Sequence, residues 1–147
     1  MGDTNEMTIE FEGRMCNEGF VRVAVAAFAT QLNPTLEEVA DIKTAVSEAV
    51  TNAIIHGYNY EIRKIWITCR ILGTDFWVSV KDEGKGIENI SKAMEPLFTT
   101  RPEEDRAGMG FAFMEAFMDD VQVESRKGNG CKVHMRKKIG HSNTKYE

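Results

Sequence analysis

The sequence predicts an α+β protein, a two-layer α/β sandwich in which helices cover one face of a mixed β-sheet. Two observations point to this class. The predicted elements follow the order β-α-α-β-β-α-β-β, and the sequence contains both the period of a half-buried strand and that of an amphipathic helix. The 147-residue chain is expected to form one domain over residues 1–136, followed by a flexible polar tail over residues 137–147.

The first two elements are a strand and a helix. Residues 7–12 (MTIEFE) alternate between apolar and polar side chains, which predicts a half-buried strand. A helix is expected over residues 17–32, and Asn33-Pro34 ends it. The side of this helix that faces the core is expected to include Phe20, Val21, Ala24, Ala27 and Phe28.

A capping box predicts the start of the second helix. Thr35 occupies the N-cap position and Glu38 follows at the third helical position, so each side chain can bind the backbone amide of the other residue. We expect the helix to end near Gly57, which we interpret as its C-cap. Its apolar positions at helical spacing are Leu36, Val39, Ile42, Val46, Val50 and Ile54.

The second half of the chain is predicted to contain four more strands and one helix. Strands are expected at residues 65–72 and 76–82, joined by a turn at 73–75, and at residues 121–125 and 131–136, joined by a turn at 127–130. Residues 110–118 predict a short helix. Residues 83–107 show no sustained period and are expected to form a loop.

Composition excludes several classes of protein. The formal net charge of −5 and the absence of a long basic run argue against binding to nucleic acid through phosphate neutralisation. The longest apolar run, residues 23–29, is too short to span a bilayer, and the polar start is unlike a signal peptide. Three scattered cysteines without a zinc spacing fit a reducing compartment. We therefore expect a soluble cytoplasmic protein that binds neither nucleic acid nor a membrane.

The first chemical motif lies in the second helix. Glu48 and Asn52 are four residues apart and therefore share one helix face, away from Val46 and Val50. For an arbitrary pair of this kind, a solvated face is the usual explanation. An amide oxygen is, however, a neutral ligand suited to a hard cation such as Mg²⁺. The pair is thus either surface polarity or part of a metal and acid–base site.

The second motif follows a strand. Alternation places Asp82 on the same apolar face as Val78 and Val80, where a carboxylate needs hydrogen-bond donors. An exocyclic amine such as N6 of adenine would satisfy it, and Gly84 and Gly86 would let the backbone approach a flat ligand closely. The alternative is an ordinary turn with a capping aspartate.

The third motif is Arg106-Ala107-Gly108-Met109-Gly110-Phe111, in which glycines lead into a predicted helix. Free backbone amides at a helix start can hold a phosphate, and Arg106 would add positive charge. A Gly-x-Gly pattern alone is weak support, and the chain has no GxxxxGK[ST] sequence, so this is not a P-loop.

Together, these motifs resemble the N-box, G1-box and G2-box of the GHKL superfamily of ATPases and kinases. Within it, EAVTNAIIHGY at 48–58, PLFTT at 96–100 and GMGF at 108–111 are similar to the small anti-sigma-factor serine kinases that act in sporulation. The resemblance extends from the first strand to about residue 121 and is weakest at residues 58–63 and in the final tail. It implies the GHKL, or Bergerat-type, ATPase fold.

The resemblance implies a role for each motif. Asn52 would hold the Mg²⁺ of bound ATP or ADP, and Asp82 would bind the adenine amine. Glu48 would be the general base that takes the proton of an acceptor serine. The remaining nucleotide-binding positions would be Gly84, Gly86, Ile87, Thr99, Arg106, Gly108, Met109 and Gly110.

The resemblance also implies partners. These would be a sporulation sigma factor of the sigma F type, an anti-anti-sigma factor that is phosphorylated on serine, and a second copy of the chain in a homodimer. Glu18 and Arg22 would contact a protein partner, although an exposed i,i+4 ion pair is their ordinary interpretation. Three alternatives remain open: a nucleotide-gated binding module without kinase activity, an ATP hydrolase, and a fragment of a histidine kinase.

Overall fold

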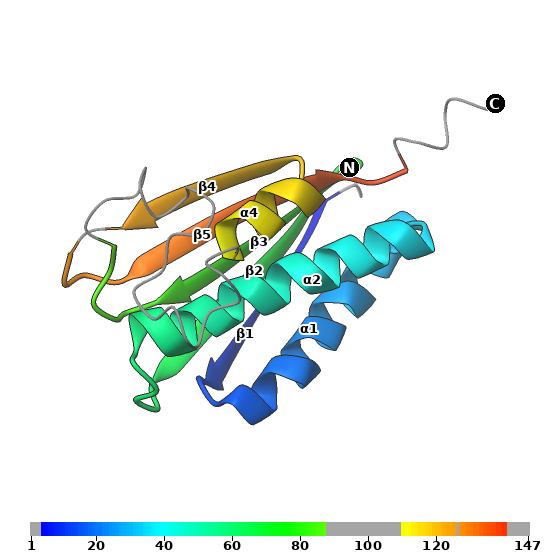
Figure 1. The fold of residues 1–147 in the computed structure, drawn as a ribbon. Coiled ribbons are helices and arrows are strands. Elements are labelled where there is room, and N and C mark those ends of the chain that lie inside the picture. Colours follow the sequence, from blue (N-terminus) through cyan, green and yellow to red (C-terminus); the bar gives the residue numbers. More distant parts are fainter. Residues whose placement is uncertain (1–3, 88–109, 126, 141–147) are drawn as a thin grey trace.

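The computed structural model describes residues 4–87, 110–125 and 127–140. The helices and strands occur in the predicted order, with a 3₁₀ turn after the first helix and a π-helical turn after the second (Figure 1). The elements are β1 (Thr4–Glu12), α1 (Met15–Ala29), η1 (Thr30–Leu32), α2 (Leu36–Asn52), η2 (Ala53–Gly57), β2 (Lys64–Leu72), β3 (Asp75–Asp82), α4 (Gly110–Phe117), β4 (Asp120–Ser125) and β5 (Cys131–Lys138).

The five described strands form one sheet in the order β1-β2-β3-β5-β4. Each pairing between them is antiparallel, so the expectation of a mixed sheet was wrong for this part of the chain. Hairpins join β2 to β3 and β4 to β5, and β5 then lies beside β3 in the opposite direction. Strand direction across the β3–β5 pair depends on this long-range contact, which the hydropathy pattern of a single strand does not encode.

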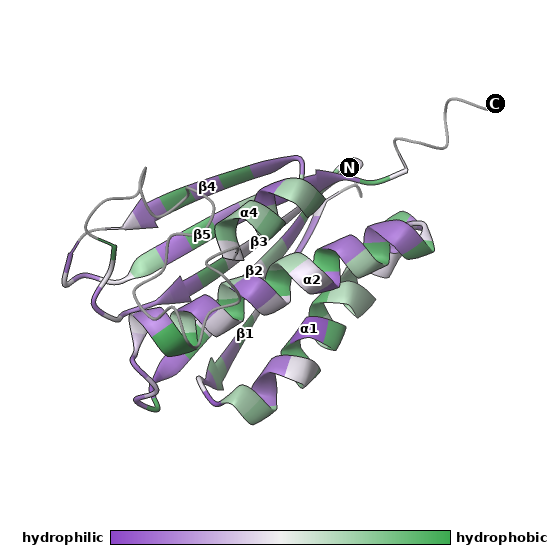
Figure 2. Ribbon diagram, viewed as in Figure 1, coloured by the Kyte–Doolittle hydropathy of each residue, from purple (hydrophilic) through white to green (hydrophobic). Residues whose placement is uncertain are grey.

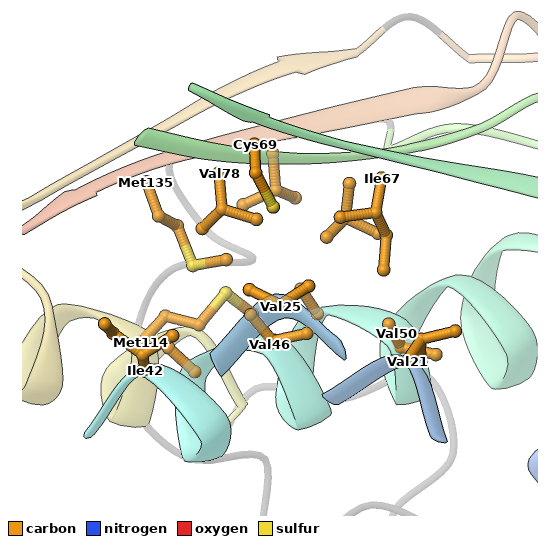
Figure 3. Packing of buried hydrophobic residues seen from close by; sticks show 14 of the residues in the cluster. Val21, Val25, Ile42, Val46, Val50, Ile67, Cys69, Val78, Met114 and Met135 are labelled. Atoms are coloured by element: carbon orange, nitrogen blue, oxygen red, sulfur yellow. The ribbon is translucent and has the colours of Figure 1, made fainter. Parts of the chain in front are cut away.

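The helices α1, α2 and α4 cover one face of the sheet, as predicted (Figure 1). Inward and outward residues alternate along β2 and β3, and Figure 2 shows the corresponding changes in hydropathy along the strands. Figure 3 shows the resulting core, in which side chains of the sheet point toward those of the helices. The side chains labelled there are Val21, Val25, Ile42, Val46, Val50, Ile67, Cys69, Val78, Met114 and Met135.

The predicted capping box of α2 is confirmed. The Oγ1 atom of Thr35 accepts a hydrogen bond of 3.0 Å from the amide of Glu38, and the Glu38 carboxylate accepts one of 2.8 Å from the amide of Thr35. These bonds satisfy two amides that the first turn of a helix otherwise leaves without partners.

The face of α1 that enters the core matches the predicted one only in part, since Val21 is buried and Phe28 packs against the core as expected. Val21, Val25 and Ala29 are buried at a spacing of four residues, whereas the Phe20 side chain is 71% exposed. Ala27 is exposed as well. Helix α1 packs against α2 and the first two strands. Its buried stripe is therefore narrow, and an apolar residue outside that stripe remains on the surface.

The chain stays packed against the domain beyond residue 136, the expected end of the last strand. Strand β5 reaches Lys138, Ile139 is buried, and the amide of Gly140 donates to the Glu38 carboxylate at 3.1 Å. The C-terminal end of the described chain is thereby tied to the start of α2. None of the helices within the described ranges is long and apolar enough to cross a membrane.

Candidate functional site

The C-terminal end of α2 forms the first part of the site. Glu48 is 5% exposed, so its interpretation as part of a solvated face is contradicted. Asn52 follows one turn later, is partly buried, and is the last residue of α2. The chain then widens into the π-helical turn η2, in which the amide of Tyr58 donates to the carbonyl of Ala53 at 2.9 Å. Single π-helical turns inside or after α-helices are frequent at functional sites.

The carboxylate of Asp82 forms the second part. It lies at the end of β3, is 6% exposed, and occupies the buried face of the strand, as predicted. Its Oδ1 atom accepts a hydrogen bond of 2.8 Å from the amide of Gly84. Burial raises the pKa of Asp82 to about 6, although the amide of Gly84, the charge of Arg63 and the amide of Cys131 act in the opposite direction.

Gly57 brings η2 into contact with Asp82. A Cβ atom on Gly57 would lie 2.9 Å from Oδ1 of Asp82, and one on Gly84 would overlap the carbonyl oxygen of Gly57. Gly57 lacks a positive φ, so its predicted role as a C-cap was wrong; Tyr58 is the residue that follows the turn. Absence of a side chain at Gly57 instead allows the helix end to approach the carboxylate. Gly86, with φ of 75°, adopts the left-handed conformation that favours glycine.

The start of α4 meets the end of α2. Gly110 is the first residue of α4 and is buried, and a Cβ atom there would lie 3.0 Å from the Nδ2 atom of Asn52. The side-chain amide of Asn52 is thus adjacent to the helix start that the sequence predicts to bind a phosphate. The first turn of a helix has backbone amides without intrahelical partners, and its dipole favours an anion.

Four predicted site residues, Thr99, Arg106, Gly108 and Met109, lie outside the described residues. Ile87 lies at the end of the described loop, and its amide donates to Oγ of Ser125 at 2.7 Å. No group of three or more His, Cys, Asp or Glu residues within the described part of the chain could hold a metal ion. A single amide oxygen at Asn52 suits Mg²⁺, which keeps several waters and binds with nucleotide phosphates.

The structure adds residues that the sequence analysis did not single out. Tyr58 is 4% exposed, and its hydroxyl accepts a hydrogen bond from the amide of Glu83 at 2.7 Å. The Arg63 guanidinium lies 4.8 Å above the Tyr58 ring. A cleft of about 580 Å³ opens beside Gly57, Tyr58 and Gly84. Tyr58 is the last residue of the motif at 48–58. No local pattern in the sequence indicates which backbone group would form a hydrogen bond with its hydroxyl.

The predicted partner residues occur on the surface of α1. The Nε atom of Arg22 lies 3.6 Å from Oε2 of Glu18, and their side chains are 40% and 17% exposed. Phe20 and Val23 on the same helix are 71% and 52% exposed. These four residues of α1, hereafter the α1 surface, include an arginine and exposed apolar side chains, which are residue types found at protein contacts.

Comparisons with known proteins agree with this architecture. Residues 17–137 match the family model of the histidine kinase-like ATPase domain. The chain is 60% identical over 137 residues to an anti-sigma F factor of Thermoanaerobacter sp. (strain X514), with 93% of this chain and 96% of the relative covered. It is 57% identical to an anti-sigma F factor of Caldanaerobacter subterraneus subsp. tengcongensis, with 94% and 96% covered, and 55% identical to that of Clostridium acetobutylicum, with 92% and 94% covered.

Solved structures show the same fold at low sequence identity. The catalytic domain of the histidine kinase ThkA superimposes with a TM-score of 0.54 at 20% identity, over 90% of this chain and 96% of that one. The histidine kinase domain of a blue-light activated histidine kinase from Erythrobacter litoralis superimposes with a TM-score of 0.53 at 17% identity, over 88% and 63%.

Proposed function

The chain belongs to the anti-sigma F factor family and contains a histidine kinase-like ATPase domain, and we propose that it is an ATP-dependent anti-sigma factor with serine kinase activity. It binds and inhibits a sporulation sigma factor of the sigma F type. With ATP, it phosphorylates a serine of the anti-anti-sigma factor that opposes it. Its place of action is the cytoplasm.

The observation that supports this function best is the convergence of three elements on one site. The end of α2 places Asn52 against Gly110 at the start of α4, and η2 places Gly57 against the carboxylate of Asp82. A metal ligand and a helix start suit the phosphates of a nucleotide, whereas a buried carboxylate beside glycines suits an amine on a flat base.

In this proposal each residue has one task. Asp82 accepts a hydrogen bond from the adenine amine, and the backbone at Gly84, Gly86 and Ile87 shapes the base pocket. Asn52 holds Mg²⁺ through its amide oxygen. Bound ATP supplies the phosphoryl group that is transferred. Thr99, Arg106, Gly108 and Met109, which lie outside the described residues, and Gly110 complete the nucleotide contacts.

Glu48 is the proposed general base. It lies one helical turn before Asn52 and is 5% exposed, so it shares the region of the proposed metal ligand. Its carboxylate takes the proton of the acceptor serine while the serine oxygen bonds to phosphorus and the bond to the leaving ADP breaks. Such transfer depends mainly on positioning and on neutralisation of charge.

The proposed protein contacts use the α1 surface. Glu18 and Arg22 form an ion pair on this helix, which also exposes Phe20, and this part of the chain precedes the nucleotide motifs. A homodimer is the proposed assembly, as the resemblance to the family implies. Arginine and aromatic residues are common hot spots of protein interfaces.

Incubation with γ-labelled ATP, a sigma F-type factor and its anti-anti-sigma factor tests the proposal. We expect the label on serine of the anti-anti-sigma factor, identified by phosphoamino-acid analysis. Label released only as inorganic phosphate would instead mean an ATP hydrolase, and label on a histidine of this chain a histidine kinase. Nucleotide binding without any transfer would mean a gated binding module.

The Glu48→Gln variant tests the base within the same assay. It keeps the shape of the side chain but removes the basic oxygen, and phosphorylation is expected to fall by about 10²-fold or more. Binding of ATP and of the sigma factor should persist, because neither needs proton abstraction. Glu37→Gln, an exposed position on the same helix, is the control. Near-normal single-turnover transfer by Glu48→Gln would refute the base assignment.

A further inference from the structure

Four backbone amides of the loop after β3, residues 83–87, donate hydrogen bonds that hold the loop in place. The amides of Glu83, Gly84 and Lys85 donate in turn to Oη of Tyr58 at 2.7 Å, Oδ1 of Asp82 at 2.8 Å and the carbonyl of Gly57 at 3.1 Å. Ile87 donates to Oγ of Ser125 at 2.7 Å. This segment contains the glycines proposed to shape the base pocket, so its position sets where the backbone meets a bound base.

Tyr58 holds the first end of the loop. Its hydroxyl accepts from the amide of Glu83 and donates to the carbonyl of Lys64 at 2.6 Å. The ring is buried and lies under the Arg63 guanidinium. Because burial raises the pKa of the Tyr58 phenol, the hydroxyl keeps the proton that it donates to Lys64. One side chain thus joins the start of β2 to the residue that follows Asp82.

Ser125 holds the other end. It is the last residue of β4, and its Oγ atom accepts from the amide of Ile87 and donates to the carbonyl of Gly130 at 2.8 Å. Gly130 precedes β5, which pairs with β3 so that Cys131 lies opposite Asp82. The hydroxyl therefore connects the loop to the strand that borders the Asp82 carboxylate.

We propose that Tyr58 and Ser125 are positioning residues for recognition of the adenine base: their two hydroxyls hold residues 83–87 and the end of β3 in the geometry that lets Asp82 meet the exocyclic amine. The inference rests on the proposed nucleotide-binding function. Both residues act through the loop and neither is assigned a contact with the base. Removing either hydroxyl leaves a backbone amide without its acceptor, so the loop must move to reach water.

The test compares two variants with two matched controls. Tyr58→Phe and Ser125→Ala each remove one hydroxyl. Tyr60→Phe changes an exposed tyrosine two residues further on, and Ser79→Ala changes a serine that bonds His134 on the face of the sheet away from the helices. For each protein, dissociation constants for ATP and for inosine triphosphate, which lacks the exocyclic amine, are measured by titration calorimetry. Exchange rates of the Glu83 and Ile87 amides are measured without nucleotide.

We expect each positioning variant to lose about tenfold in ATP affinity and to lose part of the preference for ATP over inosine triphosphate. Amide exchange should accelerate at Glu83 in Tyr58→Phe and at Ile87 in Ser125→Ala. The controls should retain the affinity and preference of the wild type. A role confined to stability would lower the melting temperature and leave the ratio of the two dissociation constants unchanged.

Three results would overturn the inference. One is that the ratio of the dissociation constants for ATP and inosine triphosphate is unchanged in both Tyr58→Phe and Ser125→Ala. Another is that the control variants, Tyr60→Phe and Ser79→Ala, also lose the preference for ATP over inosine triphosphate. The third is a wild-type protein that binds ATP no better than inosine triphosphate, whereas failure of the wild type to bind either nucleotide would reject the proposed function itself. If Tyr58→Phe fails to fold, Ser125→Ala decides the question alone, since its smaller change removes only one oxygen atom.

Discussion

At the scale of the residue, burial determines the behaviour of Asp82. Its pKa rises to about 6 chiefly because the carboxylate loses water at the end of β3. The unfolded chain gives up this proton at a lower pH, near 3.9. As the pH rises from about 4 to about 6, the unfolded state therefore becomes charged first, and this group contributes less stability to the fold. Above about pH 6 the native carboxylate is ionised and able to accept a hydrogen bond from an amine.

Asp82→Asn is expected to abolish binding of ATP and ADP while the domain stays folded. Asparagine keeps the shape of the side chain, but its amide can present the NH₂ group toward the adenine amine. Both groups are donors, so no hydrogen bond forms between them. Above pH 6 the free energy of unfolding should rise by up to about 3 kcal/mol, because a buried charge is removed. Calorimetric titration and denaturant unfolding measure both effects. Asp75→Asn, at the other end of β3, is the control, and a well-formed nucleotide complex of Asp82→Asn would contradict the adenine assignment.

The same carboxylate predicts a pH dependence of binding. Affinity for adenosine, which has no phosphate to titrate, should fall as the pH drops below about 6, since protonation removes the charged acceptor. The same slope should persist in Asp75→Asn, which keeps the buried Asp82 carboxylate. An equal affinity at pH 5 and pH 7.5 in the wild type would show that the charge of Asp82 does not participate.

At the scale of the element, the π-helical turn η2 determines how α2 meets the sheet. The turn places Gly57 against Asp82 and directs Tyr58 toward the loop after β3. Asn59 and Tyr60 follow with positive φ values of 52° and 66°. Left-handed backbone is uncommon for residues other than glycine, so the chain leaves the helix through a conformation that tertiary contacts must maintain.

Gly57→Ala is expected to weaken ATP binding about tenfold with little change in stability. The new Cβ atom would lie 2.9 Å from the Asp82 carboxylate, which must rotate away and lose its orientation. Alanine favours a helical backbone, and this offsets part of the cost. Gly19→Ala in α1 is the control, because its Cβ atom would meet only Arg22 at 3.8 Å. Unchanged affinity in Gly57→Ala would mean that the carboxylate has room to adjust.

At the scale of the molecule, α2 separates two surfaces. Figure 1 shows α2 between α1 and α4, so the α1 surface and the start of α4 lie on different sides of that helix. The proposed nucleotide contacts come from the end of α2, the end of β3 and the start of α4. Helix α1 packs on α2 but contributes none of the proposed nucleotide contacts, so the effects of substitutions on the α1 surface can be measured separately from those at the nucleotide site.

Arg22→Ala is expected to reduce capture of a sigma F-type factor by about 30-fold, the scale of an interface hot spot, while ATP affinity stays constant. Pull-down in the presence of ATP and calorimetric titration measure the two quantities. Arg70→Ala is the control: Arg70 is also an exposed arginine paired with a glutamate, Glu6, but it lies on the sheet face away from the helices. Normal capture by Arg22→Ala would leave Arg22 an ordinary surface charge.

Much of this protein could be predicted from the sequence because the deciding interactions are local. The order of the elements follows from hydropathy periods, and the capping box joins residues three positions apart. Strand alternation placed Asp82 on the buried face. The spacing of the motifs, together with their resemblance to the GHKL superfamily, singles out Glu48, Asn52 and Asp82 as proposed site residues.

Only the tertiary structure decided the features that depend on contacts between distant segments. Phe20 was expected in the core, but the place of α1 at the side of α2 leaves it exposed. The pairing of β5 with β3 made the described sheet antiparallel throughout. The sequence predicts Gly57 as a helix C-cap. In the fold, Gly57 instead lies against the carboxylate of Asp82, 25 positions further along the chain. Hydropathy periods report which side of an element is buried; which partner covers that side is determined by packing of the whole chain.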